Sequence, residues 1–198
     1  MKIDPIAIIE AFYRPGGRAY ALLVRHGRQV AAMALEVARR VPHLNPDMEF
    51  IREAALMHDI GIFLTRAPGL GCIGRHAYVC HGYLGGEILR EMGLPDHAAV
   101  CERHVGAGLT AVEIREQDLP LPPRDMIPMS VEEQIIAYAD KFYSKLDRRS
   151  GEKRPADILD ELGRYSNAAA QRFRAWIDRF ETPERHGAIV SVSTSTLR

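Results

Sequence analysis

The sequence of 198 residues has few of the features that identify a protein class directly. Its three cysteines, Cys72, Cys80 and Cys101, lack the short paired spacing of a thiolate zinc site or a disulfide framework. Ordinary buried thiols in a reducing compartment are the simpler interpretation. The 26 Lys and Arg residues balance the 26 Asp and Glu residues, so no net field favours nucleic acid or an anionic membrane surface. An anionic ligand must therefore be held by a local site.

Long hydrophobic runs are also missing. No window approaches the roughly 18 uninterrupted apolar residues of a membrane span, and the start of the chain, residues 1–5, has no apolar signal core behind a basic segment. These absences predict a cytoplasmic protein whose partner is neither a membrane nor a nucleic acid polymer. The sequence does not indicate an oligomeric state.

Apolar residues recur at helical spacing along most of the chain, with no internal repeat and no convincing strand. Asp4 and Pro5 have the pattern of an N-cap followed by the first helical residue. Ser130 and Glu133 have capping-box spacing. The periodicity predicts helical segments over residues 4–13, 26–41, 45–61, 75–92, 95–104, 130–146 and 155–180.

We therefore predict an all-α, single-domain bundle of six or seven helices. Residues 1–19 form an N-terminal helix and turn, and residues 20–146 form the main domain. Residues 147–186 form a C-terminal helical extension packed on that domain, and residues 187–198 a flexible tail. The proline-bearing segment 105–129 is predicted to be a loop that, together with residues 62–80, supplies the walls of the functional pocket.

Several polar side chains lie on or beside apolar helix faces, where an unpartnered group would cost a few kcal/mol. The adjacent pair His58 and Asp59 precedes Gly61, and its side chains can converge on one ion at a helix end. His26, His81, His104 and Asp140 occupy comparable positions. A shared metal centre would satisfy all of them, because imidazole and carboxylate together suit iron, manganese, cobalt or zinc.

The order His26, His58-Asp59, Asp140 resembles the H…HD…D signature of the HD-domain metal-dependent phosphohydrolase superfamily. The stretch Ala55-Leu56-Met57-His58-Asp59-Ile60-Gly61 is similar to the HDIG subgroup, and Ile136-Ala137-Tyr138-Ala139-Asp140-Lys141 to its closing Ala-Asp element. This resemblance spans roughly residues 20 to 146 and implies an HD-type helical bundle.

The segments His81-Gly82-Tyr83-Leu84-Gly85-Gly86 and Arg103-His104-Val105-Gly106 fall where two-metal HD proteins place two further histidines. The layout is closer to the HD-superfamily bis(5′-nucleosyl)-tetraphosphatases than to the HD-GYP cyclic dinucleotide phosphodiesterases, because the Gly-Tyr-Pro element is absent. The resemblance implies one ion held by His26, His58, Asp59 and Asp140, and a second held by Asp59, His81 and His104.

The implied activity is hydrolysis of a phosphoester or phosphoanhydride in a nucleotide or other small phosphorylated metabolite. Two ions of iron, manganese, cobalt or zinc, roughly 3.5 to 4 Å apart, would share a bridging hydroxide that attacks the phosphorus. Asp59 is then a catalytic residue as well as a ligand. Lys145 and Arg75 are the preferred phosphate contacts. Many relatives carry a lysine where this chain has Ile62, so Arg66 or another cation is expected to replace it.

Two other functions fit the same residues. The six ligands also resemble those of the mixed-valent di-iron oxygenases of this superfamily, which need oxygen and iron in two oxidation states. A non-catalytic nucleotide-binding signalling module is the second alternative, and it predicts a degraded ligand set. His43 and His97 have positions typical of exposed turns, and His186 lies near the chain end. None of these three is predicted to bind metal.

Overall fold

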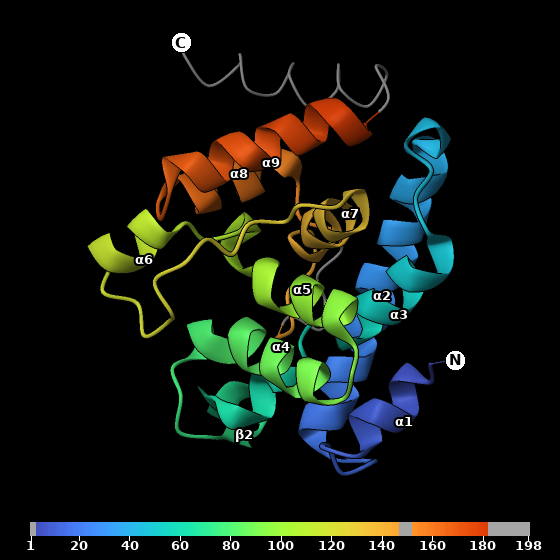
Figure 1. Ribbon diagram of the computed structural model, residues 1–198, viewed down its shortest axis with the longest axis vertical. Coiled ribbons are helices and arrows are strands. Elements are labelled where there is room, and N and C mark those ends of the chain that lie inside the picture. Colours follow the sequence, from blue (N-terminus) through green and yellow to red (C-terminus); the bar gives the residue numbers. More distant parts are fainter. Residues whose placement is uncertain (1–2, 147–151, 182–198) are drawn as a thin grey trace.

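The computed structural model describes residues 3–146 and 152–181. This part of the chain forms nine α-helices, five short 3₁₀ helices (η) and one hairpin (Figure 1). The α-helices are α1 (Pro5–Glu10), α2 (Arg18–Arg40), α3 (Met48–Met57), α4 (His81–Glu91), α5 (Pro95–Arg103), α6 (Ala111–Glu116), α7 (Val131–Asp140), α8 (Pro155–Gly163) and α9 (Asn167–Phe180). The other elements are η1 (Pro42–Leu44), η2 (Ile60–Leu64), β1 (Arg66–Ala67), η3 (Pro68–Leu70), β2 (Cys72–Ile73), η4 (Tyr78–Cys80) and η5 (Val105–Ala107).

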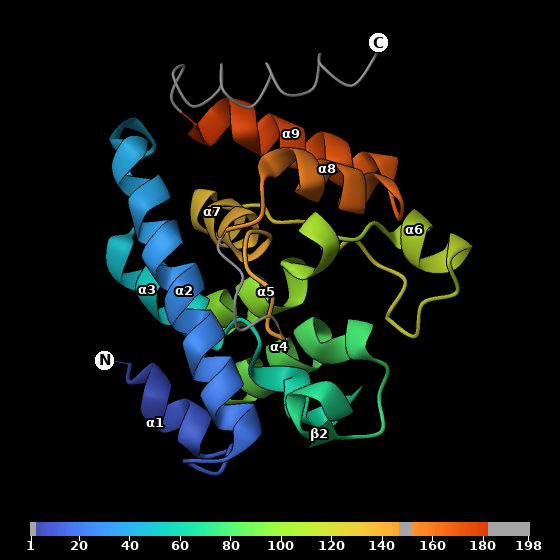
Figure 2. The same ribbon diagram turned by 180° about the vertical axis from the view of Figure 1, so that it is seen from behind.

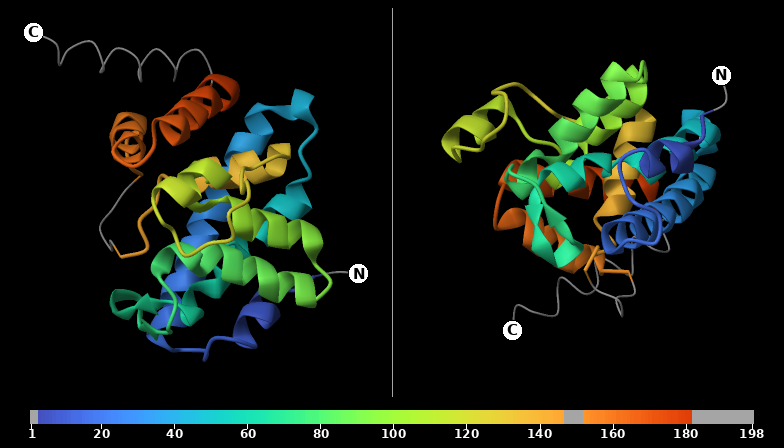
Figure 3. Two further views of the ribbon diagram at one scale, coloured as in Figure 1. Left: turned by 60° about the vertical axis from the view of Figure 1, so that its left-hand side comes forward. Right: turned by 90° about the horizontal axis from the view of Figure 1, so that it is seen from below.

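The all-α class is confirmed, although the helices are more numerous than predicted. One additional helix, α6, lies in the segment predicted to be a loop and projects from the side of the bundle (Figure 3). It begins with a complete capping box between Thr110 and Glu113. The predicted final helix is two helices, because Ser166 caps α9 after a break that follows α8. The antiparallel β1–β2 hairpin was not predicted, since strands of two residues leave no periodicity to detect.

Several predicted helix boundaries were wrong. The N-cap of α3 is Asp47, whose side chain accepts hydrogen bonds from the backbone of Glu49 and Phe50, and not Asn45. Helix α4 begins at His81 rather than near Arg75. The predicted Ser130 cap of α7 is present.

Another wrong boundary is the end of α7, which lies at Asp140, well before Leu146. Leu146 is 59% exposed and does not continue the apolar stripe of the helix.

The long helix α2 crosses the molecule, and the other elements pack around it in two main apolar clusters. One cluster joins α2, α3, α7, α8 and α9, and the other joins α1, the start of α2, η2, α4 and α5. The α8–α9 pair lies at the end of the molecule opposite α1 (Figure 2). The three cysteines are free and buried. None of the helices in the described ranges combines the length and apolarity that a membrane crossing requires.

The turn after α5 is held by the C-terminal helix α9. Three consecutive residues have positive φ, namely Gly106 (61°), the buried Ala107 (63°) and Gly108 (90°), and a non-glycine residue in this region is strained. Arg172 of α9 donates from Nε to the carbonyl oxygen of Ala107 (2.9 Å) and from Nη2 to that of Gly108 (2.6 Å). The guanidinium group thereby stabilises an unfavourable backbone conformation.

Replacing Arg172 by methionine should therefore lower the free energy of unfolding by about 2 kcal/mol, because two charge-assisted hydrogen bonds to carbonyl groups are lost. Arg174→Met is the matched control, since Arg174 lies on the exposed side of the same helix. Urea denaturation followed by circular dichroism measures both variants. Equal stability of the two variants would contradict this role of Arg172.

Candidate metal centre

The six predicted ligands come from five helices and converge at one buried point. His26 lies within α2, while the other five lie at helix ends. His58 and Asp59 follow α3, His81 opens α4, His104 follows α5, and Asp140 closes α7. Each of the six residues is at most 5% exposed. Helix ends release the side chains from the helical repeat, which is why the adjacent pair His58 and Asp59 can face one centre.

The carboxylate of Asp59 lies between two pairs of histidines. Its Oδ2 is 3.4 Å from Nε2 of His26 and 3.3 Å from Nε2 of His58. Its Oδ1 is 3.2 Å from Nε2 of His81 and 3.5 Å from Nε2 of His104. Each carboxylate oxygen therefore faces its own pair of imidazoles.

Asp140 lies on one side of this arrangement only. Its Oδ1 is 2.9 Å from Nε2 of His26 and 3.4 Å from Nε2 of His58. On the other side, the Nε2 atoms of His81 and His104 are 3.1 Å apart. Ligand atoms of His26, His58 and Asp140 lie within 4.8 Å of one another, and so do those of His58, Asp59 and His104.

Three of the histidines are held in the tautomer that binds metal through Nε2. Nδ1 of His58 is 2.7 Å from the carbonyl oxygen of Ala55, and Nδ1 of His81 is 2.6 Å from that of Tyr78. Nδ1 of His104 is 2.7 Å from the carbonyl oxygen of Cys101. Since a carbonyl oxygen only accepts hydrogen bonds, each Nδ1 carries the proton. The Nε2 atom of each ring therefore faces the centre.

Polar atoms at this centre are left without hydrogen bonds. In the described part of the chain, Nε2 of His58 and both carboxylate oxygens of Asp59 are buried and have no hydrogen-bond partner, apart from the ammonium group of Lys145 beside Oδ2 of Asp59. Such groups cost a few kcal/mol each unless something else satisfies them. A cation would do so, and the combination of imidazole and carboxylate suits iron, manganese, cobalt or zinc. The residues present therefore fit a metal centre.

Charges in the site keep most ligands in the protonation state that metal binding requires. Burial opposes ionisation of Asp59, but His58 and Lys145 hold the pKa of its carboxyl group well below the usual range. Asp140 behaves in the same way, with Lys141 and Lys145 beside it. Burial lowers the pKa of His104 to about 3. The carboxylates are thus anionic and His104 is neutral at neutral pH.

His58 differs, because its pKa is raised. Burial favours the neutral ring, but the charges of Asp59 and Asp140 overcome this effect and raise the pKa of His58 to about 9. Cation binding must therefore displace one proton from the site at neutral pH.

The turn that carries Asp59 is packed against α4 without space for a side chain. We predicted that Gly61 terminates a helix, but α3 ends at Met57 and Gly61 lies inside η2. A Cβ atom on Gly61 would lie 2.3 Å from the carbonyl oxygen of His81 and 2.4 Å from the backbone nitrogen of Gly85. Gly61 is thus required for the close approach that brings Asp59 next to His81.

The N-terminal segment supports the same turn from the other side. The buried hydroxyl group of Tyr13 donates to the carbonyl oxygen of Ile60 (2.8 Å) and accepts from the backbone nitrogen of Phe63 (3.0 Å). Residues before the main domain therefore help to position Asp59.

A cleft of about 540 Å³ opens beside the six residues, and His81, His104 and Asp140 reach its surface. Its walls were predicted only in part. Arg66, Ala67, Gly69, Leu70 and Tyr78 contribute, but the segment 105–129 supplies only Val105 and Gly106. The remaining wall comes from residues 141–146 and from the C-terminal region 153–165.

Cationic side chains lie at the end of the cleft near the six residues. Nζ of Lys145 is 2.9 Å from Oδ2 of Asp59 and 3.9 Å from Oδ1 of Asp140. Nζ of Lys141 is 2.8 Å from Oδ2 of Asp140. Arg66 also lines the cleft, and it forms no ion pair with any carboxylate in the described ranges.

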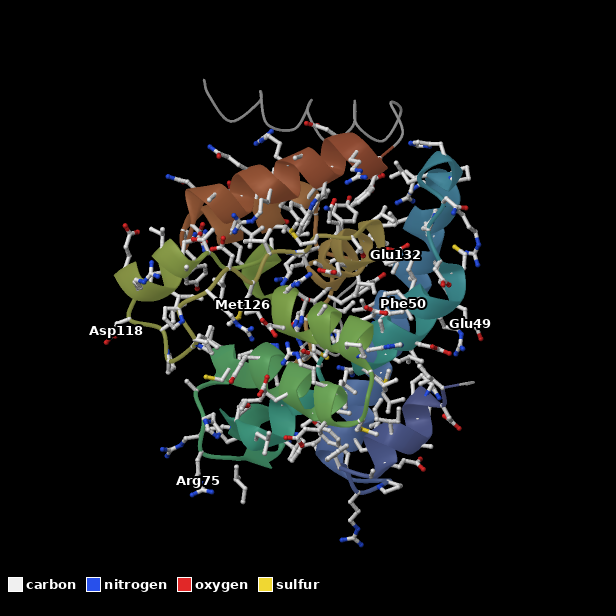
Figure 4. All side chains as sticks on the ribbon, viewed as in Figure 1. Glu49, Phe50, Arg75, Asp118, Met126 and Glu132 are labelled. Atoms are coloured by element: carbon white, nitrogen blue, oxygen red, sulfur yellow. The ribbon has the colours of Figure 1, made fainter. Side chains whose placement is uncertain are left out.

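The structure does not bring Arg75 to the site. Arg75 is exposed, does not line the cleft, and points away from the molecule (Figure 4). The physical reason is that residues 75–77 are not helical, so no helix face directs Arg75 toward His81. Ile62 is buried in the core.

One buried polar pair was missed. His97 was predicted to be exposed, but it is buried, with Nε2 3.5 Å from Oε2 of Glu53 and its ring against Phe50. The spacing of His97 to Val100, Cys101 and His104 follows the buried face of α5 and could have revealed it.

Replacing Gly61 by alanine should lower the free energy of unfolding by about 2 to 3 kcal/mol, because the new methyl group forces η2 and α4 apart. Gly163→Ala is the matched control, since no atom lies within 4 Å of a Cβ at that helical position. It should be neutral or stabilising by up to about 1 kcal/mol. Denaturant titration distinguishes the two variants, and an unperturbed Gly61→Ala protein would refute the packing constraint.

Comparisons with known proteins agree with this geometry. The HD domain family model matches residues 23–144. An uncharacterized protein of Methanocaldococcus jannaschii is 34% identical over 149 residues, which cover 68% of this chain and 80% of that protein.

Two further relatives are tRNA (cytidine(56)-2'-O)-methyltransferases, from Thermoplasma volcanium and Picrophilus torridus. They are 30% and 34% identical over 142 and 128 residues, which cover 71% and 64% of this chain. The matches span only 37% and 33% of those enzymes. The similarity thus concerns about a third of each methyltransferase.

Among solved structures, the HD domain of the L. monocytogenes phosphodiesterase PgpH is similar, with a TM-score of 0.51 and 16% identity over 89% of this chain and 96% of that chain. The same domain in complex with cyclic-di-AMP has a TM-score of 0.50 and 17% identity over 87% of this chain and 92% of that chain. At this identity the likeness shows a shared fold.

Proposed function

The chain belongs to the HD-domain family, and from this premise we propose that it is a metal-dependent phosphohydrolase with a binuclear centre. The observation that carries the proposal is the position of Asp59, whose two oxygens each face a separate pair of histidines. His26, His58, Asp59 and Asp140 would hold one ion, and Asp59, His81 and His104 the other. We propose iron, manganese, cobalt or zinc, because these ions suit the donor set.

Two such ions, when bound, supply an activated water and neutralise charge on a phosphoryl oxygen. The chain's own residues have three tasks. Burial of the six ligands excludes bulk water and strengthens the electrostatic interactions of the site. Lys145 lies against Asp59, where its ammonium group would contact a substrate phosphate. Arg66 provides a further charge that no carboxylate of the described chain neutralises.

The substrate that we propose is a small phosphoester or phosphoanhydride, with nucleotides as the first candidates. The cleft volume of about 540 Å³ falls within the range of small-molecule sites. A phosphodiesterase domain that shares the fold binds cyclic-di-AMP, so cyclic dinucleotides belong among the candidates. The methyltransferase activity of two relatives is not transferred to this chain, because it belongs to proteins of which this chain matches about a third.

The purified, metal-replete protein should hydrolyse at least one member of a panel of dinucleoside polyphosphates, nucleotides, cyclic dinucleotides and sugar phosphates. Turnover is measured by phosphate or nucleotide release, with manganese or cobalt under anaerobic conditions. Chelation should abolish turnover and metal addition should restore it. Oxygen-dependent cleavage of a small phosphonate without hydrolysis would establish a di-iron oxygenase instead. Binding without any turnover would establish a non-catalytic module.

Removal of the Arg66 charge should weaken catalysis, because a phosphate contact is lost. We expect Arg66→Gln to reduce kcat/KM about tenfold or more. Arg75→Gln is the matched control and should retain the wild-type kcat/KM, since Arg75 points away from the cleft. Steady-state kinetics on the best substrate of the panel provide the comparison. An equal loss in both variants would rule out a specific contact at Arg66.

A further inference from the structure

The cleft has an outer wall that lies beyond the matched family domain. This outer wall consists of Lys153, Ile158, Glu161, Leu162 and Tyr165. The family model matches only residues 23–144, so these five residues belong to the C-terminal extension of this chain.

Charge is distributed unevenly between the two ends of the cleft. Near the candidate metal centre lie Lys141 and Lys145. Arg66 also lines the cleft, and it has no ion pair with a residue of the described ranges. On the outer wall the only charged residues, Lys153 and Glu161, neutralise each other at 2.6 Å between Nζ and Oε2. A second phosphate at the outer wall would find its one cation, Lys153, already paired with Glu161, whereas an uncharged group needs no cationic partner there.

Tyr165 contributes an exposed aromatic side chain to this wall. Its side chain is 74% exposed, and in the described ranges its ring stacks on no other aromatic side chain. The backbone beneath it is fixed, because its amide donates to the carbonyl oxygen of Leu162 (3.0 Å) and its own carbonyl oxygen accepts from Nε2 of Gln117 (3.3 Å). Ile158 and Leu162 form the buried apolar base of the wall.

We propose that the outer wall binds an uncharged aromatic ring in the organic part of a phosphate ester, with Tyr165 as its stacking partner. The position of the phosphate at the inner end rests on the proposed function. An exposed tyrosine on a fixed backbone gives large contact area at little conformational cost. Tyr165 is thus a specificity-determining residue, and a purine nucleoside monophosphate has the required charge at one end and ring at the other.

Calorimetric binding to the metal-free protein tests this directly, with AMP and ribose 5-phosphate as probes, because they differ only by the base. We expect AMP to bind about tenfold more tightly than ribose 5-phosphate. Tyr165→Ala should reduce this ratio about fivefold, in line with a stacking contribution of about 1 kcal/mol, without weakening ribose 5-phosphate. Tyr165→Phe should keep the ratio, and so should Asp160→Ala, an exposed change on α8 outside the cleft.

Equal binding of the two probes, or an unchanged ratio in Tyr165→Ala, would overturn the proposal. Circular dichroism verifies that each variant is folded, and Tyr165→Phe provides the test if the alanine variant is not, because loss of the preference in the phenylalanine variant would exclude stacking. Turnover of the same probes is measured separately. If AMP is preferred in binding but neither probe is hydrolysed, the proposal for the outer wall is supported, whereas the proposed hydrolysis of these probes is refuted.

Discussion

The buried carboxylate of Asp59 meets four imidazole nitrogens and one ammonium group, and the rest of the structure is arranged around this contact. Apart from this ammonium group, its oxygens have no hydrogen-bond partner in the described chain, so the buried anion depends entirely on cationic neighbours. A carboxylate shared between two histidine pairs is the simplest way to hold two ions close together, which is why we assign this residue the central role.

The fold positions Asp59 mainly through close backbone packing. Gly61 lets η2 lie against α4, and Gly27 lets α2 approach α3, since a Cβ there would be 2.9 Å from the carbonyl oxygen of Leu56. Tyr13 fixes η2 from the N-terminal side, and Arg172 fixes the strained turn after His104 from the C-terminal side. Segments outside the family domain thus stabilise the site as well as forming its outer wall.

The six residues of the candidate metal centre could be predicted to be buried together, because a polar residue at a buried position stands out in an apolar helical pattern. Arg75 could not be excluded in this way, because its direction depends on the hairpin and η4, which are too short to produce periodicity. His97 was wrongly predicted to be exposed because it follows Pro95. Its burial could not be inferred from a local partner, because Glu53, which it contacts, lies on another helix. The contribution of α8 to the cleft depends on tertiary packing, which no local pattern in residues 152–165 encodes.

Metal content per chain, measured by elemental analysis of the purified protein and two variants, tests the central role of Asp59 most directly. We expect about two transition-metal ions in the wild type, about one in His81→Ala, and none retained in Asp59→Ala. Circular dichroism verifies that each variant is folded. A wild-type protein that binds no metal under replete conditions, or an Asp59→Ala variant that still holds two ions, would contradict the role of Asp59 as the carboxylate shared by two ions.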